Sequence, residues 1–297
     1  MAWCPRRSVA LGFAWLAPAL IAGVGHAYDI PNQVMQSFTF ELHSVDDDID
    51  LYIGNPQSLF LMYVRPQASL LPHLEFSNTA QVGLLRVRDL SLFEEPPMPD
   101  DLSEEEAELW EEPEARVVAQ EWRMELTPSA PALVVLRCVH GKARYDFTGI
   151  DVREAYLLAD TAQVRVDFDR PNRVVLERFK VTSNSGSLRV RRFLNSRARS
   201  TSIAVPNARC ELELTGETTP GYFEIFVEGV PEKLKLTLLR HMALHVEGPS
   251  PNVLRFDRKD LERVGTGLQS PGYAASPCRI SLHFSHAIPK LEIEWVE

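Results

Sequence analysis

The chain has 297 residues, of which 45% are hydrophobic and 24% are charged, so it can bury a substantial core and is not disordered overall. Its formal net charge of -10 argues against a nucleic-acid-binding protein, because such proteins carry a basic excess. The 21 prolines outnumber the 15 glycines, a balance that suits a β-rich protein with many turns better than a helical bundle.

Residues 1–27 have the features of a secretory signal peptide. A pair of arginines precedes an apolar run over residues 9–24, and Gly25-His26-Ala27 places small residues at the −3 and −1 positions of a cleavage site. A membrane anchor is the alternative, but the run is short and is interrupted by proline and glycine. We therefore predict cleavage before Tyr28 and an exported protein of the periplasm or cell surface, with no transmembrane span after signal removal.

Acidic residues are concentrated in residues 93–116. Subtracting the eleven acids and one base of this segment from the totals of 41 and 31 leaves 30 acids and 30 bases. We interpret the segment, which also holds four prolines, as a solvated linker or flap. A docking strip for a basic partner or for divalent ions is the alternative. The segment divides the chain into the signal peptide (1–27), an N-terminal β region (28–92), the acidic proline-rich linker (93–116) and a β-solenoid domain (117–297).

From Leu133 onward the sequence repeats with a period of about 22 residues. Each unit contains two short segments in which apolar and polar residues alternate, and turn residues separate them. Such alternation predicts strands. The first segments are Leu133-Val135, Ala155-Leu157, Phe179-Val181, Thr201-Ile203, Phe223-Ile225 and Leu244-Val246. The later segments are Ala143-Tyr145-Phe147, Val164-Val166-Phe168, Leu188-Val190, Cys210-Leu212-Leu214 and Leu234-Leu236-Leu238.

Paired strands at a fixed spacing are typical of a solenoid, in which each coil buries its apolar row against the next. We therefore predict an all-β protein with a right-handed, single-stranded, β-helix-like solenoid of about 22 residues per coil, preceded by an N-terminal β region. A meandering β-sandwich would give alternation but not this regular double spacing. In the predicted register, one buried column contains Val135, Leu157, Val181, Ile203 and Ile225.

The flanking regions also alternate. We expect strands over residues 37–43, 49–53, 58–64, 83–89, 253–256, 279–284 and 291–296. Asp46, Asp47, Asp48 and Asp50 suggest a calcium loop, but the sixth position is not glycine and no glutamate closes the loop. We predict an acidic turn there instead.

Several of these segments resemble known bacterial domains. The stretches GKARYDFTGIDVREAYLLADTAQVRVDF, FKVTSNSGSLRVRRFLNS and ARCELELTGE are similar to the toast-rack and adhesin-like β-solenoid domains of bacterial envelope proteins. The stretches DIDLYIGNPQSLFLMYV, LEFSNTAQVGLLRVRD and EWRMELTPSAPALVVLRC are similar to the N-terminal part of toast-rack proteins. The resemblance covers most of residues 45–240 and implies a non-enzymatic envelope protein, adhesin-like or involved in sensing cell-wall stress. The chain departs from the pattern in its acidic insert and at Arg192, where an apolar residue is expected and where we predict a β-bulge.

Outward-facing positions of the later strands would form two ladders. One contains Arg144, Arg165, Arg189, Glu211 and Lys235, and the other contains Asp146, Asp167, Arg191, Glu213 and Thr237. Because stacked strands lie about 4.8 Å apart, three successive arginines could hold a polyanion such as a phosphate-rich or uronic-acid wall polymer. Because Asp146 and Asp167 lie beside Arg144 and Arg165 on the same face, we favour local neutralisation of these arginines instead.

A denser basic cluster comprises Arg189, Arg191, Arg192, Arg197 and Arg199. Because no acidic residue is near it in the sequence, we predict that these five arginines are the better anion-binding site. The partner would be an anionic polymer or another envelope protein. The acidic segment of the same chain could also dock there.

Three cysteines, Cys138, Cys210 and Cys278, remain after the signal is removed. At most one internal disulfide can form among them, so we predict that the fold is not a disulfide-built scaffold. Their spacing matches no zinc motif.

Signatures of catalysis are absent from the sequence, which has no Gly-x-Ser-x-Gly, His-Glu-x-x-His or Gly-Lys-Ser/Thr motif. His241 and His245 fall on a predicted strand, where they lie too far apart to share one zinc ion, and we interpret His283 and His286 as surface histidines. We predict no metal, no cofactor and a non-catalytic binding or scaffolding function. The alternative is a β-helix lyase or hydrolase acting on an acidic polymer, with the two ladder aspartates as a carboxylate pair.

Overall fold

The computed structural model describes residues 26–65, 71–89, 120–217, 221–249, 253–255, 261–265, 267–287 and 289–297. The predicted signal peptide, apart from its last two residues, and the whole acidic segment lie outside these ranges, so the predictions made for them stay predictions. The described chain is all-β, as predicted, and its strands form one large mixed sheet. Within these ranges no helix has the length and apolar character needed to cross a membrane.

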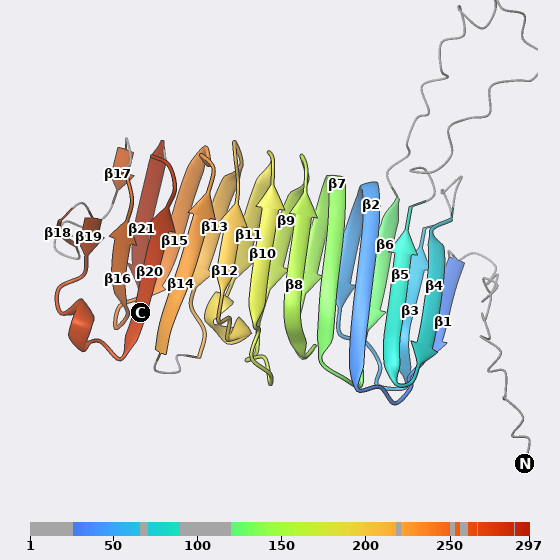
Figure 1. Cartoon of the computed structure of the whole chain (residues 1–297). Coiled ribbons are helices and arrows are strands. Elements are labelled where there is room, and N and C mark those ends of the chain that lie inside the picture. The colour runs from blue at the N-terminus through green and yellow to red at the C-terminus, as the bar shows by residue number, and fades with distance from the viewer. Residues whose placement is uncertain are drawn as a thin grey trace, which may run out of the picture.

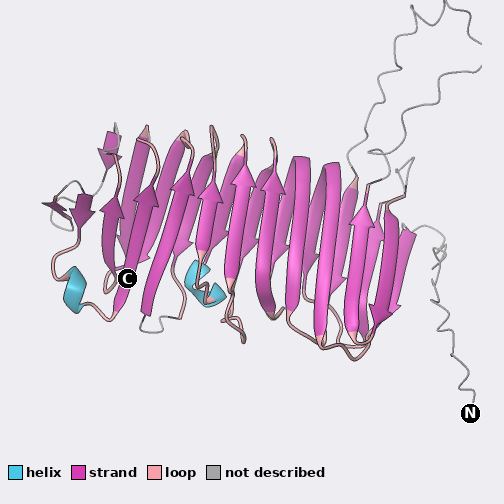
Figure 2. Ribbon diagram, viewed as in Figure 1, coloured by secondary structure: helices cyan, strands magenta, loops and turns pink. Residues whose placement is uncertain are grey.

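Strands joined by short turns make up most of the described chain, with two short 3₁₀ turns among them (Figure 2). The strands are β1 (His26–Pro31), β2 (Ser37–Tyr52), β3 (Ser58–Val64), β4 (His73–Thr79), β5 (Val82–Arg88), β6 (Glu121–Leu126), β7 (Ala132–Asp146), β8 (Val152–Ala159), β9 (Gln163–Asp167), β10 (Arg178–Ser183), β11 (Ser187–Arg191), β12 (Thr201–Ala204), β13 (Arg209–Leu214), β14 (Gly221–Glu228), β15 (Lys233–Leu239), β16 (Ala243–Glu247), β17 (Val253–Arg255), β18 (Glu262–Val264), β19 (Gly267–Gln269), β20 (Cys278–Phe284) and β21 (Lys290–Val296). The 3₁₀ turns are η2 (Phe193–Ser196) and η3 (Tyr273–Ala275).

The strands are arranged in two rows that run the length of the molecule (Figure 1). Row one pairs, in order, β4, β5, the first half of β2, the first half of β7, β8, β10, β12, β14, β20, β16, β19 and β18. Row two pairs β1, β3, β6, the second half of β2, the second half of β7, β9, β11, β13, β15, β21 and β17. Pairing is parallel along the middle of both rows. Antiparallel strands close both ends of row one and the β1 end of row two.

The inward-facing side chains of both rows form one buried hydrophobic core. Alternation along each strand produces this core, since every second side chain points inward. In row two the predicted pairings are confirmed: Val166 pairs with Tyr145 and with Val190, and Val190 pairs with Leu212. All four side chains are buried, and full burial of a valine or leucine side chain stabilises the fold by roughly 1.5–3 kcal/mol.

In row one the predicted buried column is wrong at both ends. Its observed members are Leu136, Leu157, Val181, Ile203 and Val227. Val135 is only half-buried, because it faces outward between the buried Val134 and Leu136. The pairing of β7 with β8 shifts by one residue near its start, so Leu136 pairs with Leu157. Ile225 is buried but pairs with Thr201 rather than with Ile203. Ile225 and Val227 are both apolar residues in an alternating stretch, so the pattern fits two registers that differ by two residues.

Two long strands, β2 and β7, pass from row one into row two. On β2 the buried positions alternate up to Ser44 and then resume at Asp47, three residues later, so the strand turns a corner without ending. The predicted acidic turn is therefore wrong, and Asp47 is buried. Its carboxylate accepts hydrogen bonds from the Ser44 hydroxyl at 2.6 Å and from the Gln120 N–H at 3.2 Å. Burial nevertheless raises the pKa of Asp47 to about 6.

Strand β7 turns the same corner at Gly141. This residue pairs with Asp47 and has a φ of 84°. A Cβ atom at Gly141 would lie 2.4 Å from the Asp47 carbonyl oxygen. The left-handed backbone and the lack of space therefore both require glycine at this position.

At both ends of the molecule the spatial order of the strands departs from the chain order (Figure 1). Strand β2 precedes β5 and β6 in the sequence but lies between them and β7. Strands β20 and β21 lie between the β14–β15 pair and the β16–β17 pair. The predicted stacking of Leu244-Val246 on Phe223-Ile225 is therefore wrong. Leu244 and Val246 are buried, but they pair with β20.

Strands from both sides of the predicted boundary at residues 93–116 pair directly. Strand β2 pairs with β6 along its second half and with β7 along most of its length. The N-terminal β region and the solenoid domain are therefore joined by strand pairing. That they are separate folding units stays a prediction.

Candidate anion-binding face

The outer face of row two carries the predicted run of arginines. Arg144 on β7, Arg165 on β9 and Arg189 on β11 occupy paired positions on adjacent parallel strands. We call these three residues the basic ladder. In-register pairing places successive members one strand spacing apart, about 4.8 Å between backbones. The sequence prediction that these three arginines are neighbours is therefore confirmed.

A shallow groove runs beside the basic ladder. Lys142, Gln163 and Ser187 pair with one another there, two residues before the arginines on the same strands. Lys142 is exposed, and it makes no ion pair with the residues that the structure describes. Asp48 and Asp50 of the adjacent strand β2 also line the groove, where they pair in register with Lys142 and Arg144, and so does Glu121 of β6. Its basic part therefore lies over β7, β9 and β11.

One buried carboxylate, that of Asp167, lies beneath the basic ladder. Nε of Arg165 is 2.7 Å from it, and the guanidinium groups of Arg191 and Arg144 are 3.5 Å and 3.6 Å from it. The Asp167 side chain is only 3% exposed. A single carboxylate carries one negative charge, so it offsets only one of the three guanidinium groups that surround it. The neutralisation that we considered from the sequence is thus partial.

The remaining counter-charges are weakly coupled to the basic ladder. Arg189 lies 3.5 Å from Glu211, but its side chain is 54% exposed, as is that of Arg144. Ion pairs at this exposure contribute little and leave the guanidinium groups accessible to a ligand. Asp146 accepts a hydrogen bond from the Thr148 N–H, which ties its carboxylate to the turn that follows β7.

The five-arginine cluster predicted from the sequence is not one site. Arg189 and Arg191 lie on β11 in row two, whereas Arg192 and Arg197 flank η2 and both have left-handed backbones. Arg199 follows η2 and pairs with a glutamate of the preceding coil. Only the first two therefore share the face of the basic ladder.

The expectation that no acid lies near these arginines is also wrong. Acids from neighbouring strands and from the segment between β9 and β10 reach four of the five arginines. The pairs are Arg189–Glu211, Arg191–Asp167, Arg191–Glu213, Arg192–Asp169 and Arg199–Glu177. Arg197 donates to the backbone carbonyls of Asn172 and Arg173. The acids are distant in sequence but adjacent in register, so a local search of the sequence misses them.

Arg192 does not form the predicted β-bulge. Its φ of 51° ends β11 and starts the 3₁₀ turn η2. The turn places Phe193 in the core, where its ring lies 5.1 Å from that of Phe179 and 6.3 Å from that of Phe168. Arg192 itself pairs with Asp169 at 2.6 Å. Its backbone therefore has a structural role in addition to any role in binding.

The carboxylate pair of the enzyme alternative, Asp146 and Asp167, does occupy paired positions on β7 and β9. Asp167, however, is nearly inaccessible, and guanidinium groups occupy its oxygens. A glycosidase carboxyl group has to reach the glycosidic oxygen or the anomeric carbon of its substrate. The geometry of this pair does not meet that requirement.

Histidine and cysteine side chains do not assemble a metal site among the described residues, where no group of three or more potential ligands is present. Cys138, Cys210 and Cys278 are free and buried. Burial raises the pKa of Cys138 and of Cys210 to about 12. Neither thiol is therefore reactive at neutral pH.

The far end of row two is electrostatically different from the basic ladder. Glu292 of β21 lies 2.6 Å from the Lys233 amine and 2.9 Å from the Lys290 amine. These two hydrogen bonds lower the pKa of Glu292 to about 2. Cations at this end of the face thus have close partners, whereas Lys142 at the ladder end has none among the described residues.

Sequence reasoning missed Lys142 as a member of the site. The residue stands two positions before Arg144 on the same strand, so the alternation that identified the ladder also points Lys142 outward. Lys142 could therefore have been predicted from the sequence as a member of the same face.

Comparison with known proteins adds little to this description. No family model and no curated protein matches the chain. Among solved structures, a putative cell adhesion protein from Clostridium sporogenes matches 91% of this chain and 98% of its own, with 10% sequence identity and a TM-score of 0.45.

Proposed function

We propose that the chain is an exported, non-catalytic binding protein of the cell envelope, which holds an anionic polymer on the outer face of row two. The observation that carries this proposal is the basic ladder together with Lys142. These four cationic side chains lie on three adjacent strands and line one groove. The buried Asp167 carboxylate contacts two of them, Arg144 and Arg165, and the exposed Glu211 pairs with Arg189. Guanidinium groups bind carboxylates and phosphates through two parallel hydrogen bonds, which favours a polymer bearing such groups.

The proposal includes the finer features expected from the sequence. These are removal of residues 1–27, location in the periplasm or at the cell surface, and an adhesin-like or stress-sensing accessory role. They also include a right-handed solenoid with coils of about 22 residues. Of the five arginines predicted to bind anions, Arg189 and Arg191 lie on the proposed face. Arg192, Arg197 and Arg199 would form a separate, weaker site.

Polymer-binding measurements on the wild type and on charge-removal variants test the proposal. Polygalacturonate, a uronic-acid polymer, is titrated into the exported chain by calorimetry, with neutral dextran as the control polymer. We expect polygalacturonate to bind and dextran not to bind. We also expect the affinity to fall at 0.5 M NaCl, because ionic contacts at an exposed face are screened.

The decisive variant is Lys142→Gln/Arg144→Gln, which removes two exposed charges from the groove. We expect about tenfold weaker binding, which corresponds to about 1.4 kcal/mol. The matched control, Arg173→Gln/Arg178→Gln, makes the same charge change at two exposed positions away from the groove. A third variant, Arg197→Gln/Arg199→Gln, tests the remainder of the sequence-predicted cluster. Equal weakening in all three would show that binding follows net charge alone and would contradict a defined site.

A further inference from the structure

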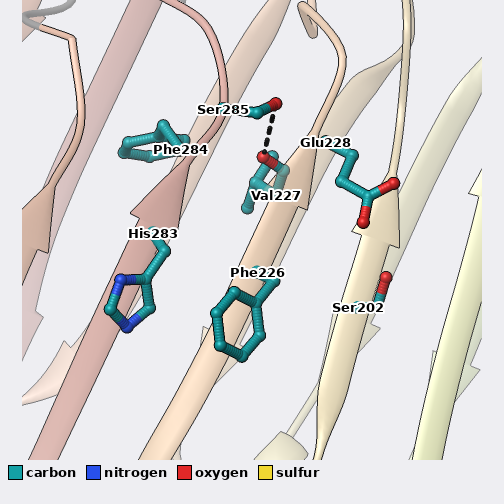
Figure 3. A pocket seen from close by; sticks show the side chains of 7 residues that line it. All are labelled: Ser202, Phe226, Val227, Glu228, His283, Phe284 and Ser285. Carbon is teal, nitrogen blue, oxygen red and sulfur yellow. Dashed lines mark hydrogen bonds between the residues drawn. The ribbon is translucent and has the colours of Figure 1, made fainter.

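A second hollow lies on the outer face of row one. Its side chains come from three adjacent strands: Ser202 from β12, Phe226 and Glu228 from β14, and His283 from β20, with Ser285 just beyond β20. Figure 3 shows the Phe226 and His283 rings next to each other, with Ser202 on the other side of Phe226. None of these residues belongs to the groove of the basic ladder.

Small side chains on β12 create this hollow. Ser202 pairs with Lys180 of β10 on one side and with Phe226 of β14 on the other. Two strand spacings therefore separate the backbones of Lys180 and Phe226, which is about 9.6 Å. Only the serine hydroxyl stands between these two long side chains. The lining therefore combines the Phe226 ring, the Ser202 hydroxyl and the Glu228 carboxylate in a slot on the outer face, and Lys180 is a register neighbour outside that lining.

A neighbouring histidine ring holds the Phe226 ring in place. The ring of His283 stacks on that of Phe226, with centroids 4.8 Å apart and an angle of 14° between the planes. His283 is in turn positioned by Glu247, whose carboxylate lies 3.1 Å from Nδ1. Phe226 is nonetheless 40% exposed. An exposed aromatic ring that is fixed on one face offers its other side to a ligand at little cost in side-chain entropy.

We propose that this slot binds a pyranose ring of a glycan, at a site separate from the proposed polymer face. The flat, weakly apolar C–H side of a sugar ring suits the free side of Phe226, and its hydroxyl groups suit the polar groups around it. The Ser202 hydroxyl and the Glu228 carboxylate, which both line the hollow, accept hydrogen bonds from sugar hydroxyls. No polar partner of Ser202 or Lys180 exists among the described residues, so both remain available.

A quaternary ammonium group is the main competitor for an aromatic surface flanked by carboxylates. Glu228 and Glu247 would attract such a cation. Two observations favour the sugar: the cation Lys180 is on the strand next to Ser202, and His283 already covers one side of the Phe226 ring. A cation cage needs several open aromatic faces, and this hollow has one.

Saturation-transfer NMR and calorimetry with defined oligosaccharides test the proposal. The probes are cellotetraose, maltotetraose and chitotetraose, with choline as the cationic competitor. We expect at least one tetrasaccharide to bind, with the strongest saturation transfer on ring C–H protons. Phe226→Ala should weaken that binding at least tenfold, and Ser202→Leu should do the same by filling the slot. Leu158→Ala, which shortens a 44% exposed apolar side chain elsewhere on row one, should leave binding unchanged.

Three outcomes would overturn the assignment. The first is that no tetrasaccharide binds the folded wild-type chain, with folding checked by circular dichroism. The second is equal binding by Phe226→Ala, Ser202→Leu and Leu158→Ala, and the third is Phe226-dependent binding of choline without sugar binding. The Lys142→Gln/Arg144→Gln variant separates the two proposals. It should bind the tetrasaccharide normally, whether or not it has lost polygalacturonate.

Discussion

The middle and the two ends of this molecule are built by different rules. From β8 to β13, each strand pairs with the equivalent strand of the coil before and after it in the sequence. At the ends, the spatial order differs from the chain order. Strand β2 lies between β5 and β7, and strand β20 lies between β14 and β16. The middle is therefore specified by local repetition, and the ends by long-range pairing.

This difference bears on how the parts are stabilised. A coil in the middle buries its apolar side chains against two similar coils, so its contribution resembles a nearest-neighbour term. The inserted strands instead join segments far apart in sequence, and their contacts require closure of long loops. We therefore expect the middle to be the most cooperative part and the β16–β17 end to open separately.

The largest effect is expected from a charge placed in the middle. Ile203 is 1% exposed and lies between Val181 and Val227. Ile203→Asp buries an unpaired carboxylate, which costs several kcal/mol. We expect loss of the cooperative transition in urea, or failure to fold. The neighbouring change Ser202→Asp, which faces outward, is the control and should melt like the wild type. Normal melting of Ile203→Asp would reject the register of row one.

A cavity at the inserted end should have a smaller and more local effect. Leu282 of β20 is fully buried and pairs with Ile225 and Val246. Leu282→Ala should cost about 2–5 kcal/mol. Hydrogen exchange should show lost protection in β16 and β20 while β8–β11 stay protected. Leu212→Ala, an equivalent cavity in the middle, should reduce protection across both rows. The same pattern in both variants would remove the distinction between middle and end.

At the opposite end of the molecule, the buried Asp47 in the corner of β2 should make the stability of the fold depend on pH. The pKa of Asp47 is raised from 3.8 to about 6, so the folded chain binds this proton more tightly than the unfolded chain. Burial of the carboxylate therefore destabilises the fold above pH 6, and the penalty disappears as the pH falls to about 4.

Asp47→Asn removes that charge and can keep both hydrogen bonds, since the amide oxygen accepts from Gln120 and the amide nitrogen donates to Ser44. We expect it to increase the free energy of unfolding at pH 7.5 by up to about 3 kcal/mol, and to match the wild type near pH 4. Asp48→Asn is the exposed control and should change little at either pH. A destabilised Asp47→Asn protein at pH 7.5 would contradict this account.

The smallest effect is expected at the salt bridges of β21. The lowered pKa of Glu292, about 2 against 4.5, means that its ion pairs stabilise the folded chain above pH 4.5 and are lost as the pH falls through about 2. Because the site is partly solvated, Glu292→Gln should cost only about 1 kcal/mol at pH 7. The difference from the wild type in urea unfolding should shrink below pH 4.5. Glu294→Gln, at a 54% exposed position, should give no measurable change.

Prediction from the sequence succeeded where the alignment of the repeats gave the strand register that the structure has. In row two, aligning the repeats placed Tyr145, Val166, Val190 and Leu212 in the observed register, and the basic ladder followed from that alignment. In row one, residues 223–227 fit two registers, and the one that we predicted would have put Glu224 beside Ser202. The observed register puts Phe226 there instead, so the hollow on row one could not have been found.

Long-range pairing explains the other errors. The sequence around Leu282 alternates like that of any coil, and nothing in it indicates insertion between β14 and β16. The acids that pair with Arg192 and Arg199 belong to the preceding coil, so they lie more than twenty residues away in the chain. The buried Asp47 was mistaken for a turn residue because four neighbouring aspartates are normally solvated.

The parallel register of row two also fixes the distance between equivalent side chains on successive strands. Side chains at equivalent positions repeat at the strand spacing of about 4.8 Å, and the protein cannot change that spacing without breaking its hydrogen bonds. A polymer whose charges repeat at a distance one-tenth different would drift out of phase by half a repeat after about five strands. The basic ladder spans three strands, short enough for such a polymer to stay in phase. Selectivity on this face would then depend on the distance between charges as well as on their sign.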